Sequence, residues 1–154
     1  MIRTDAELKT AQKRLAKKQD TLRNQREELK KIGLSEEEIE KAIAPLASRR
    51  DQLHEKIETF HRMRRGNLSA LHDLRNIGSW LIGARIAKGW SLSDLANALE
   101  VSVQQVSRDE NDEYQSITVK RAQRVLDALG VQFSLELDEP ILGSDRNGTG
   151  GPTR

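Results

Sequence analysis

The sequence predicts a mainly α-helical protein: an N-terminal antiparallel helical hairpin followed by a small helical domain that ends in a short β-strand. Ala, Glu, Lys, Leu and Arg make up nearly half of the 154 residues, as in long helices and coiled coils. Only 3% of the residues are aromatic, too few for a large β-sandwich core. Apolar residues recur at helical spacing through most of the chain before Gly130 and then alternate once with polar ones.

The composition also excludes several kinds of chemistry. The chain has no cysteine, so it can form no disulfide, thiolate nucleophile or cysteine-based zinc site. No apolar run approaches the roughly 18 residues of a membrane span, and the first residues lack the apolar core of a signal peptide. We therefore expect a cytoplasmic protein that makes no contact with a membrane.

Residues 1–65 are predicted to form the hairpin. This region carries 17 basic and 12 acidic residues. Leucines repeat every seven positions in its first half, at Leu8, Leu15, Leu22 and Leu29. A second column is more polar and consists of Ala11, Lys18, Gln25 and Ile32. Gly33 can end this helix in a left-handed conformation, and Ser35 with Glu38 forms the capping box that begins the next one.

The second helix of the hairpin has the more apolar stripe. One heptad column comprises Ile39, Leu46, Leu53 and Phe60, and the other comprises Ile43, Arg50 and Ile57. Pro45 lacks an N–H group and clashes with the preceding turn, so it is expected to kink the helix or to restart it. The short connection predicts an antiparallel pair about 40 Å long, at 1.5 Å per residue.

Residues 66–137 are predicted to form one small domain. Its first helix carries apolar residues from Leu74 to Ile86 and ends near Gly89. Ser91 with Asp94 caps a short helix that runs from Leu92 to about Leu99. Ser102 with Gln105 caps a third helix, from Val103 to about Asp109.

A fourth helix and a strand complete this domain. The helix runs from about Val119 to Leu129 and ends at Gly130, with its apolar face formed by Val119, Ala122, Val125, Leu126 and Leu129. Residues 131–137 alternate apolar and polar side chains, which is typical of a half-buried strand. Residues 138–154 are rich in glycine and proline and are expected to be disordered.

The second and third helices of this domain are joined by a tight turn and have the helix-turn-helix pattern. The segment ARIAKGWSLSDLANALEVSVQQVSRDEN, residues 84–111, resembles the repressor-type XRE/Cro helix-turn-helix family. Ala96 matches the family's alanine in the first motif helix, and Glu110-Asn111 matches the pair that follows the reading helix. The family's apolar positions are matched by Leu95, Leu99, Val101 and Val106. The resemblance extends from Ile77 to Leu129.

The resemblance implies which residues contact double-stranded DNA. Gln104 would recognise an adenine, and Arg108 a guanine or a phosphate. Ser91 and Ser93, at the start of the first motif helix, would present backbone N–H groups to a phosphate. The remaining implied positions on the reading helix are Ser102, Val103 and Ser107. Beside the motif, the basic cluster Arg62, Arg64 and Arg65 offers further phosphate contacts.

The sequence departs from the family at two places. Glu100 stands where relatives have glycine in the turn, so it must adopt a positive φ or shift the turn. Residues 109–113 contain four carboxylates, which phosphates would repel, and residues 66–137 carry 7 basic and 9 acidic residues. Arg85 and Glu110 occupy the positions of a structural ion pair in relatives.

The resemblance implies a sequence-specific transcriptional regulator that binds operator DNA as a homodimer. It would act as a repressor, and an antitoxin that represses its own operon is one form. The hairpin would provide a dimerisation surface or bind a partner such as a toxin. The alternative is a protein-interaction adaptor whose helix-turn-helix domain no longer reads DNA. No enzymatic activity, metal or cofactor is expected: the glycine-rich phosphate and dinucleotide motifs are absent, and His54 and His61 are too far apart to share a metal.

Overall fold

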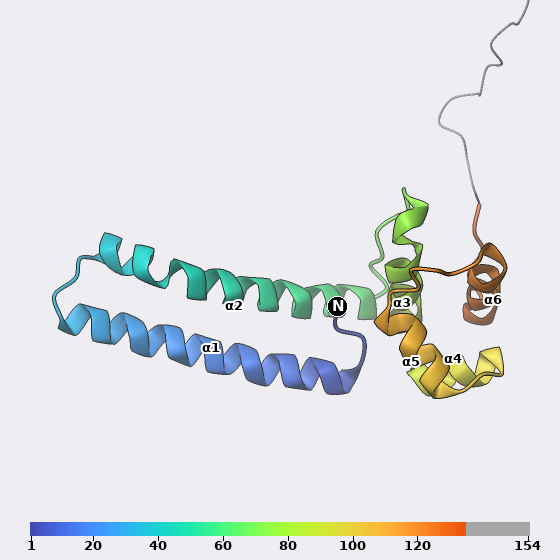
Figure 1. Cartoon of the computed structure of the whole chain (residues 1–154), viewed down its shortest axis with the longest axis horizontal. Coiled ribbons are helices and arrows are strands. Elements are labelled where there is room, and N and C mark those ends of the chain that lie inside the picture. The colour runs from blue at the N-terminus through green and yellow to red at the C-terminus, as the bar shows by residue number, and fades with distance from the viewer. Residues whose placement is uncertain (135–154) are drawn as a thin grey trace, which may run out of the picture.

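The computed structural model describes residues 1–134, and its regular elements are helical (Figure 1). In chain order they are α1 (Asp5–Lys31), α2 (Glu36–Arg64), the short 3-10 helix η1 (Leu74–Asn76), α3 (Ile77–Ala87), α4 (Leu92–Leu99), α5 (Val103–Asn111) and α6 (Val119–Leu129). Helices α1 and α2 form a long antiparallel hairpin that extends from one side of a small bundle made by α3 to α6 (Figure 1). The predicted, mainly α-helical fold class is confirmed.

The ends of the hairpin helices are capped as the sequence predicts. The Thr4 hydroxyl accepts a hydrogen bond from the backbone N–H of Glu7 at the start of α1. Gly33 follows the helix with φ +87°, a conformation that a Cβ would strain. The Ser35 and Glu38 side chains form a complete capping box at the start of α2, with the Ser35 N–H donating to Glu38 at 2.8 Å.

Helix α2 passes through Pro45 without restarting. Pro45 lies on the exposed side of the helix. Because proline has no N–H, the carbonyl of Lys41 loses its usual backbone partner, and Lys41 is exposed as well. Buried Ile39 and Ile43 before the proline and Ile57 after it keep one continuous apolar stripe against α1. Of the two outcomes expected at Pro45, a kink or a restart, the restart does not occur, because packing of this stripe outweighs the lost hydrogen bond.

The hairpin contains two separate clusters of buried side chains. The distal cluster, near the connection between the helices, consists of Leu22, Ile39 and Ile43. At the other end, Ile57, Phe60 and Met63 belong to the same core as the small domain. The polar heptad positions Lys18 and Arg50 fall between the two clusters. The base of the hairpin and the helical bundle are therefore one packed unit.

Helix α3 is central to this shared core, since every residue from Leu81 to Ile86 is buried. The other three helices contribute Leu95, Val106 and Val125, each 1% exposed. Two hydrogen bonds from basic side chains to helix ends hold the bundle together. Arg124 donates to the carbonyl of Leu99 at 2.9 Å, and Lys88 donates to the carbonyl of Leu129 at 2.7 Å. The core thus fixes the position of α4 and α5 relative to the hairpin.

Gly78 allows a close approach between α3 and the loop after α5. A Cβ built on this residue would lie 1.7 Å from the carbonyl oxygen of Glu113. Glu113 and Tyr114 both adopt left-handed backbone conformations there, with φ of 48° and 53°. A larger residue than glycine at position 78 would displace this loop, which carries the last part of the acidic segment.

Three sequence predictions differ from the structure. The first domain helix begins at Ile77, because Leu74 lies in the preceding 3-10 turn and is 56% exposed. Val119 is 88% exposed: it is the first residue of α6, one turn before the buried face begins at Ala122. Residues 131–134 do not form a strand, and residues 135–137 of the predicted strand lie outside the described residues. The predicted disordered tail, 138–154, also lies outside them.

No helix within residues 1–134 combines the length and the apolar character needed to cross a membrane.

Candidate nucleic-acid interface

Helices α4 and α5 are short, fully capped and joined by a three-residue turn. Ser91 caps α4 through a capping box with Asp94, whose carboxylate accepts from the Ser91 N–H and hydroxyl, both at 2.7 Å. These hydrogen bonds hold the pKa of Asp94 below its ordinary value. Ser102 caps α5 by accepting from the N–H of Gln105. The N-terminal ends of both helices are therefore well defined.

Glu100 closes the turn between these helices in the left-handed conformation, with φ 56° and ψ 44°. Its N–H donates back to the carbonyl of Asn97, and the N–H of Val101 donates to the carbonyl of Ala96. Of the two alternatives that the sequence left open, a positive φ or a shifted turn, the structure has the positive φ. The turn geometry is kept although glycine is absent.

One face of the α4–α5 unit is buried and the other is exposed. Leu95, Ala96 and Leu99 of α4 and Val106 of α5 pack into the shared core. On α5, Gln104 and Arg108 are exposed and lie one helical turn apart, so they share one face. This face is the part of α5 that is available to an outside partner.

The other residues that the sequence points to lie around this face. Ser91, Ser93 and Ser102 are exposed at the helix starts, whereas Val103 and Ser107 are half-buried. The guanidinium of Arg108 lies 3.4 Å from the side-chain oxygen of Gln105. A cavity of about 370 Å³ opens between the start of α4, Val103 and the base of the hairpin. The structure thus brings the start of α4, the start of α5 and the hairpin base to one region.

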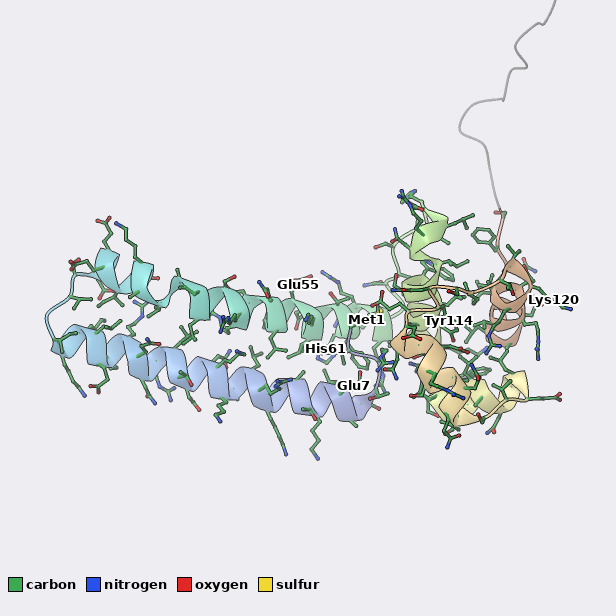
Figure 2. The ribbon with its side chains drawn as sticks, in the orientation of Figure 1. Met1, Glu7, Glu55, His61, Tyr114 and Lys120 are labelled. Atoms are coloured by element: carbon green, nitrogen blue, oxygen red, sulfur yellow. The ribbon has the colours of Figure 1, made fainter. Side chains whose placement is uncertain are left out.

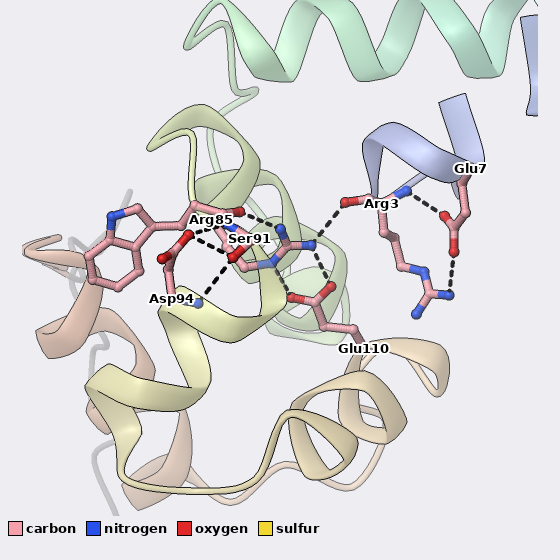
Figure 3. A network of polar contacts seen from close by, with 7 residues as sticks. Arg3, Glu7, Arg85, Ser91, Asp94 and Glu110 are labelled. Carbon is pink, nitrogen blue, oxygen red and sulfur yellow. Dashed lines mark hydrogen bonds and ion pairs between the residues drawn. The ribbon is translucent and has the colours of Figure 1, made fainter. Parts of the chain in front are cut away.

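Arg85 of α3 and Glu110 of α5 form a buried ion pair (Figure 3). Their side chains are 2% and 0% exposed, and the guanidinium donates to both carboxylate oxygens, at 2.5 and 2.7 Å. Arg85 Nη1 also donates to the carbonyl of Trp90 at 2.7 Å, and Nη2 to the carbonyl of Arg3 at 3.1 Å. All three nitrogens of this guanidinium group therefore donate to α5, the α3–α4 loop or the segment before α1.

The acidic segment after α5 is divided between the interior and the surface. Asp109 is paired with Arg121 of α6 and accepts a hydrogen bond from Gln105 at 2.8 Å, so it points toward α6. Asp112 and Glu113 are exposed. The side chain of Tyr114 lies inside the domain (Figure 2), and burial raises the pKa of its hydroxyl, with Glu110 and Asp109 adding to the effect.

The basic cluster at the end of α2 is exposed but largely paired. Arg62 contacts Glu55 at 2.8 Å, and Arg64 forms an ion pair with Asp5 and lies over the ring of Phe60. Arg64 borders the cavity beside α4, whereas Arg62 borders a different one, between α2, the loop after it and α3. Arg62 and Arg64 therefore border different cavities, while Arg65 is exposed and has no ion pair within residues 1–134.

Sequence reasoning missed several residues that position this interface. Arg121, which pairs with Asp109, and Gly78, which sets the loop after α5, were not singled out. The carbonyl of Arg3 is a backbone group, so no side-chain pattern could reveal its contact with Arg85. The spacing of twelve residues between Asp109 and Arg121 gives no local signal either, because the two residues meet only when α6 packs against α3 and α4.

Among residues 1–134, no three His, Asp or Glu side chains come close enough to hold a metal ion.

Helices α4 and α5 are short and capped, they bury apolar residues in the core, and α5 exposes a polar face. This arrangement defines a helix-turn-helix domain, a fold that places its second helix against the DNA major groove. Residues 82–135 match the family model described as Helix-turn-helix, and this match supports the resemblance of this segment to XRE/Cro-type helix-turn-helix proteins. The match of this segment supports a DNA-binding regulator in general. No curated protein matches the chain, and no solved structure does.

Proposed function

We propose that the protein is a sequence-specific transcriptional repressor that occupies operator DNA as a homodimer. The exposed face of α5 carries this proposal, because Gln104 and Arg108 lie one turn apart on the helix that the family inserts into the major groove. The Gln104 amide can donate to and accept from an adenine, and the Arg108 guanidinium can do the equivalent at a guanine or bind a phosphate. Such a protein works in the cytoplasm, where the DNA is.

Charge and geometry support a homodimer on DNA. Residues 66–137 carry two more acidic than basic residues, so one copy offers few phosphate contacts. Two copies bound to half-sites one helical turn apart double the number of contacts between the complex and the DNA. We expect the protein to be a dimer when it is bound to DNA, and sedimentation of the free and bound protein at tens of micromolar measures this.

The hairpin supports a role in binding a protein partner, as in an antitoxin that represses its own operon. Its apolar stripes pack against each other, and within its two helices the outward side chains are mostly charged. A surface of this kind recognises a partner through complementary charges and polar contacts. If the protein is an antitoxin, its partner is a toxin encoded beside its own gene.

A mobility-shift assay against the DNA upstream of the gene, at two salt concentrations, tests the proposed function. Specific binding that falls steeply with salt is the expected result, because phosphate contacts release counterions. If the protein binds the upstream DNA no better than an unrelated duplex, the repressor proposal is wrong.

A second candidate function is an adaptor that uses the helix-turn-helix domain to bind protein. The exposed carboxylates of Asp112 and Glu113, close to the end of α5, favour it, since they would repel phosphates. The double variant Asp112→Asn with Glu113→Gln separates the two functions. A repressor should bind all DNA more tightly with this variant, most clearly at low salt. An adaptor would lose a basic partner, and its DNA affinity would stay unchanged.

A further inference from the structure

Residues 66–137 carry two more acidic than basic residues, so positive charge elsewhere in the described chain would strengthen binding to a polyanion. At the end of α2, Arg62 and Arg64 are paired with Glu55 and Asp5. Much of their charge is therefore compensated before DNA arrives. The first half of α1, in contrast, carries a run of basic residues without an ion pair to any described residue.

Between Glu7 and Asp20, helix α1 has five basic residues and no acidic one. These residues are Lys9, Lys13, Arg14, Lys17 and Lys18. Within residues 1–134, none of them takes part in an ion pair. This contrasts with the far half of α1, where Arg23, Arg26, Lys30 and Lys31 are all paired with carboxylates.

Three of these lysines share the outer side of α1. Leu8, Ala11 and Leu15 pack into the shared core, so the side of the helix that carries them faces α2 and the domain. Lys9, Lys13 and Lys17 are exposed and follow one another at four-residue intervals. Each interval is about 6 Å along the helix axis, close to two base-pair steps of a DNA strand at about 3.4 Å each. We call these three lysines the basic face of α1.

The basic face lies at the end of the hairpin that adjoins the helix-turn-helix domain. The first turn of α1 borders the same cavity as the start of α4 and Val103 of α5, and the carbonyl of Arg3 is bonded to Arg85. Figure 1 shows that the connection between α1 and α2 lies far from the domain, whereas the beginning of α1 adjoins it. Lys17 lies about 18 Å along α1 from Asp5, which is a reach of about five base pairs.

We propose that the basic face of α1 binds the phosphate backbone of duplex DNA that flanks the half-site read by α5. This proposal rests on the proposed function. Charge complementarity and continuity with the α4–α5 surface both favour DNA as the occupant over an acidic protein. The face contributes affinity without sequence preference, because lysine contacts to phosphates carry no sequence information.

The test uses the full chain and two variants with the same change of charge. The first replaces the basic face: Lys9→Gln, Lys13→Gln and Lys17→Gln. The control replaces three exposed basic residues at the far end of the hairpin: Arg23→Gln, Lys31→Gln and Lys41→Gln. The wild-type protein first selects its site from a library of random duplexes. Each protein is then titrated with the selected core alone and with the core extended by about ten base pairs, one helical turn, on each side.

The wild-type protein should bind the extended duplex more tightly and with a steeper salt dependence than the core. The basic-face variant should lose this difference, and its slope of log K against log salt should become shallower by up to about 0.9 for each lysine that contacts a phosphate. The control variant should behave like the wild type on both duplexes, and the base preference of all three proteins should be the same.

Several results would overturn the inference. If the basic-face variant binds both duplexes like the wild type, the face does not contact DNA, and an acidic protein becomes the better candidate for its partner. If it loses as much affinity on the core as on the extended duplex, the lysines do not act on flanking DNA. Equal losses with the control variant would mean an effect of net charge alone. If the wild type selects no site, the proposed function fails first, and this inference with it.

Discussion

The Nη2 atom of Arg85 lies 3.1 Å from the carbonyl oxygen of Arg3, a residue 82 positions earlier in the chain. The same guanidinium group holds both carboxylate oxygens of Glu110 in α5 (Figure 3). A single buried cation therefore connects the segment before the hairpin with the helix that would read DNA. The hairpin is thus held to the helix-turn-helix domain by a polar contact as well as by their shared core.

Replacing Arg85 by methionine should lower the free energy of unfolding by about 3–5 kcal/mol, because Glu110 would be left as an unpaired buried charge. Adding Glu110→Leu should recover much of this loss. Urea denaturation of the single and double variants measures both effects. The control is Glu37→Gln in an exposed pair, which should cost less than about 1 kcal/mol. Equal costs for Arg85→Met and the control would contradict the structural role of the pair.

Replacing Gly78 by alanine should destabilise the domain by about 1–3 kcal/mol or more, since the new methyl group would meet the carbonyl of Glu113. Gly66→Ala is the matched control: its surroundings are open, and only its positive φ is strained, at about 1–2 kcal/mol. Thermal denaturation compares the two variants. If Gly78→Ala is as mild as an ordinary surface substitution, the close contact with the loop at Glu113 is not present in solution.

Replacing Glu100 by glycine should stabilise the protein by up to about 1 kcal/mol, because the left-handed conformation is strained for glutamate and not for glycine. Glu100→Gln keeps the strain and removes the charge, so its stability should remain close to that of the wild type. A gain in stability from Glu100→Gln as large as from Glu100→Gly would show that charge, and not backbone strain, is responsible.

Replacing Gln104 by alanine should weaken binding to the selected site by about 1–3 kcal/mol and leave binding to random DNA nearly unchanged. The side chain is exposed on α5 and would act by contacting a base edge. Gln52→Ala, on the exposed side of α2, is the control and should affect neither affinity. Equal losses on specific and random DNA would show that Gln104 does not read a base.

Most helices could be predicted from the sequence because their boundaries depend on local interactions. Capping pairs such as Ser35 with Glu38 and Ser91 with Asp94 act over three residues, and apolar spacing marks the buried faces. The start of α3 and the exposure of Val119 were not predictable in this way. In both cases an apolar residue fits the helical spacing but lies at or just before the first turn, outside the contact made by neighbouring helices.

The candidate interface was less predictable than the helices. The positions on α5 follow from the family resemblance, and the structure shows which of them are exposed. The compensation of Arg62 by Glu55 and of Arg64 by Asp5 depends on side-chain contacts that span 7 and 59 positions. Composition alone would count both arginines as positive charge that is available to DNA. It therefore overestimates the contribution of α2 to DNA binding and hides the contribution of α1.

The separation of the hairpin's buried side chains into two clusters has a consequence for its motions. The distal cluster of Leu22, Ile39 and Ile43 has no contact with the core of the domain, so the tip can open while the base stays closed. Backbone amides near the tip should exchange with deuterium through this local opening. Those near Ile57 and Phe60 can exchange only when the whole domain unfolds. A partner that binds the tip would therefore slow amide exchange there and leave amide exchange in the helix-turn-helix domain unchanged.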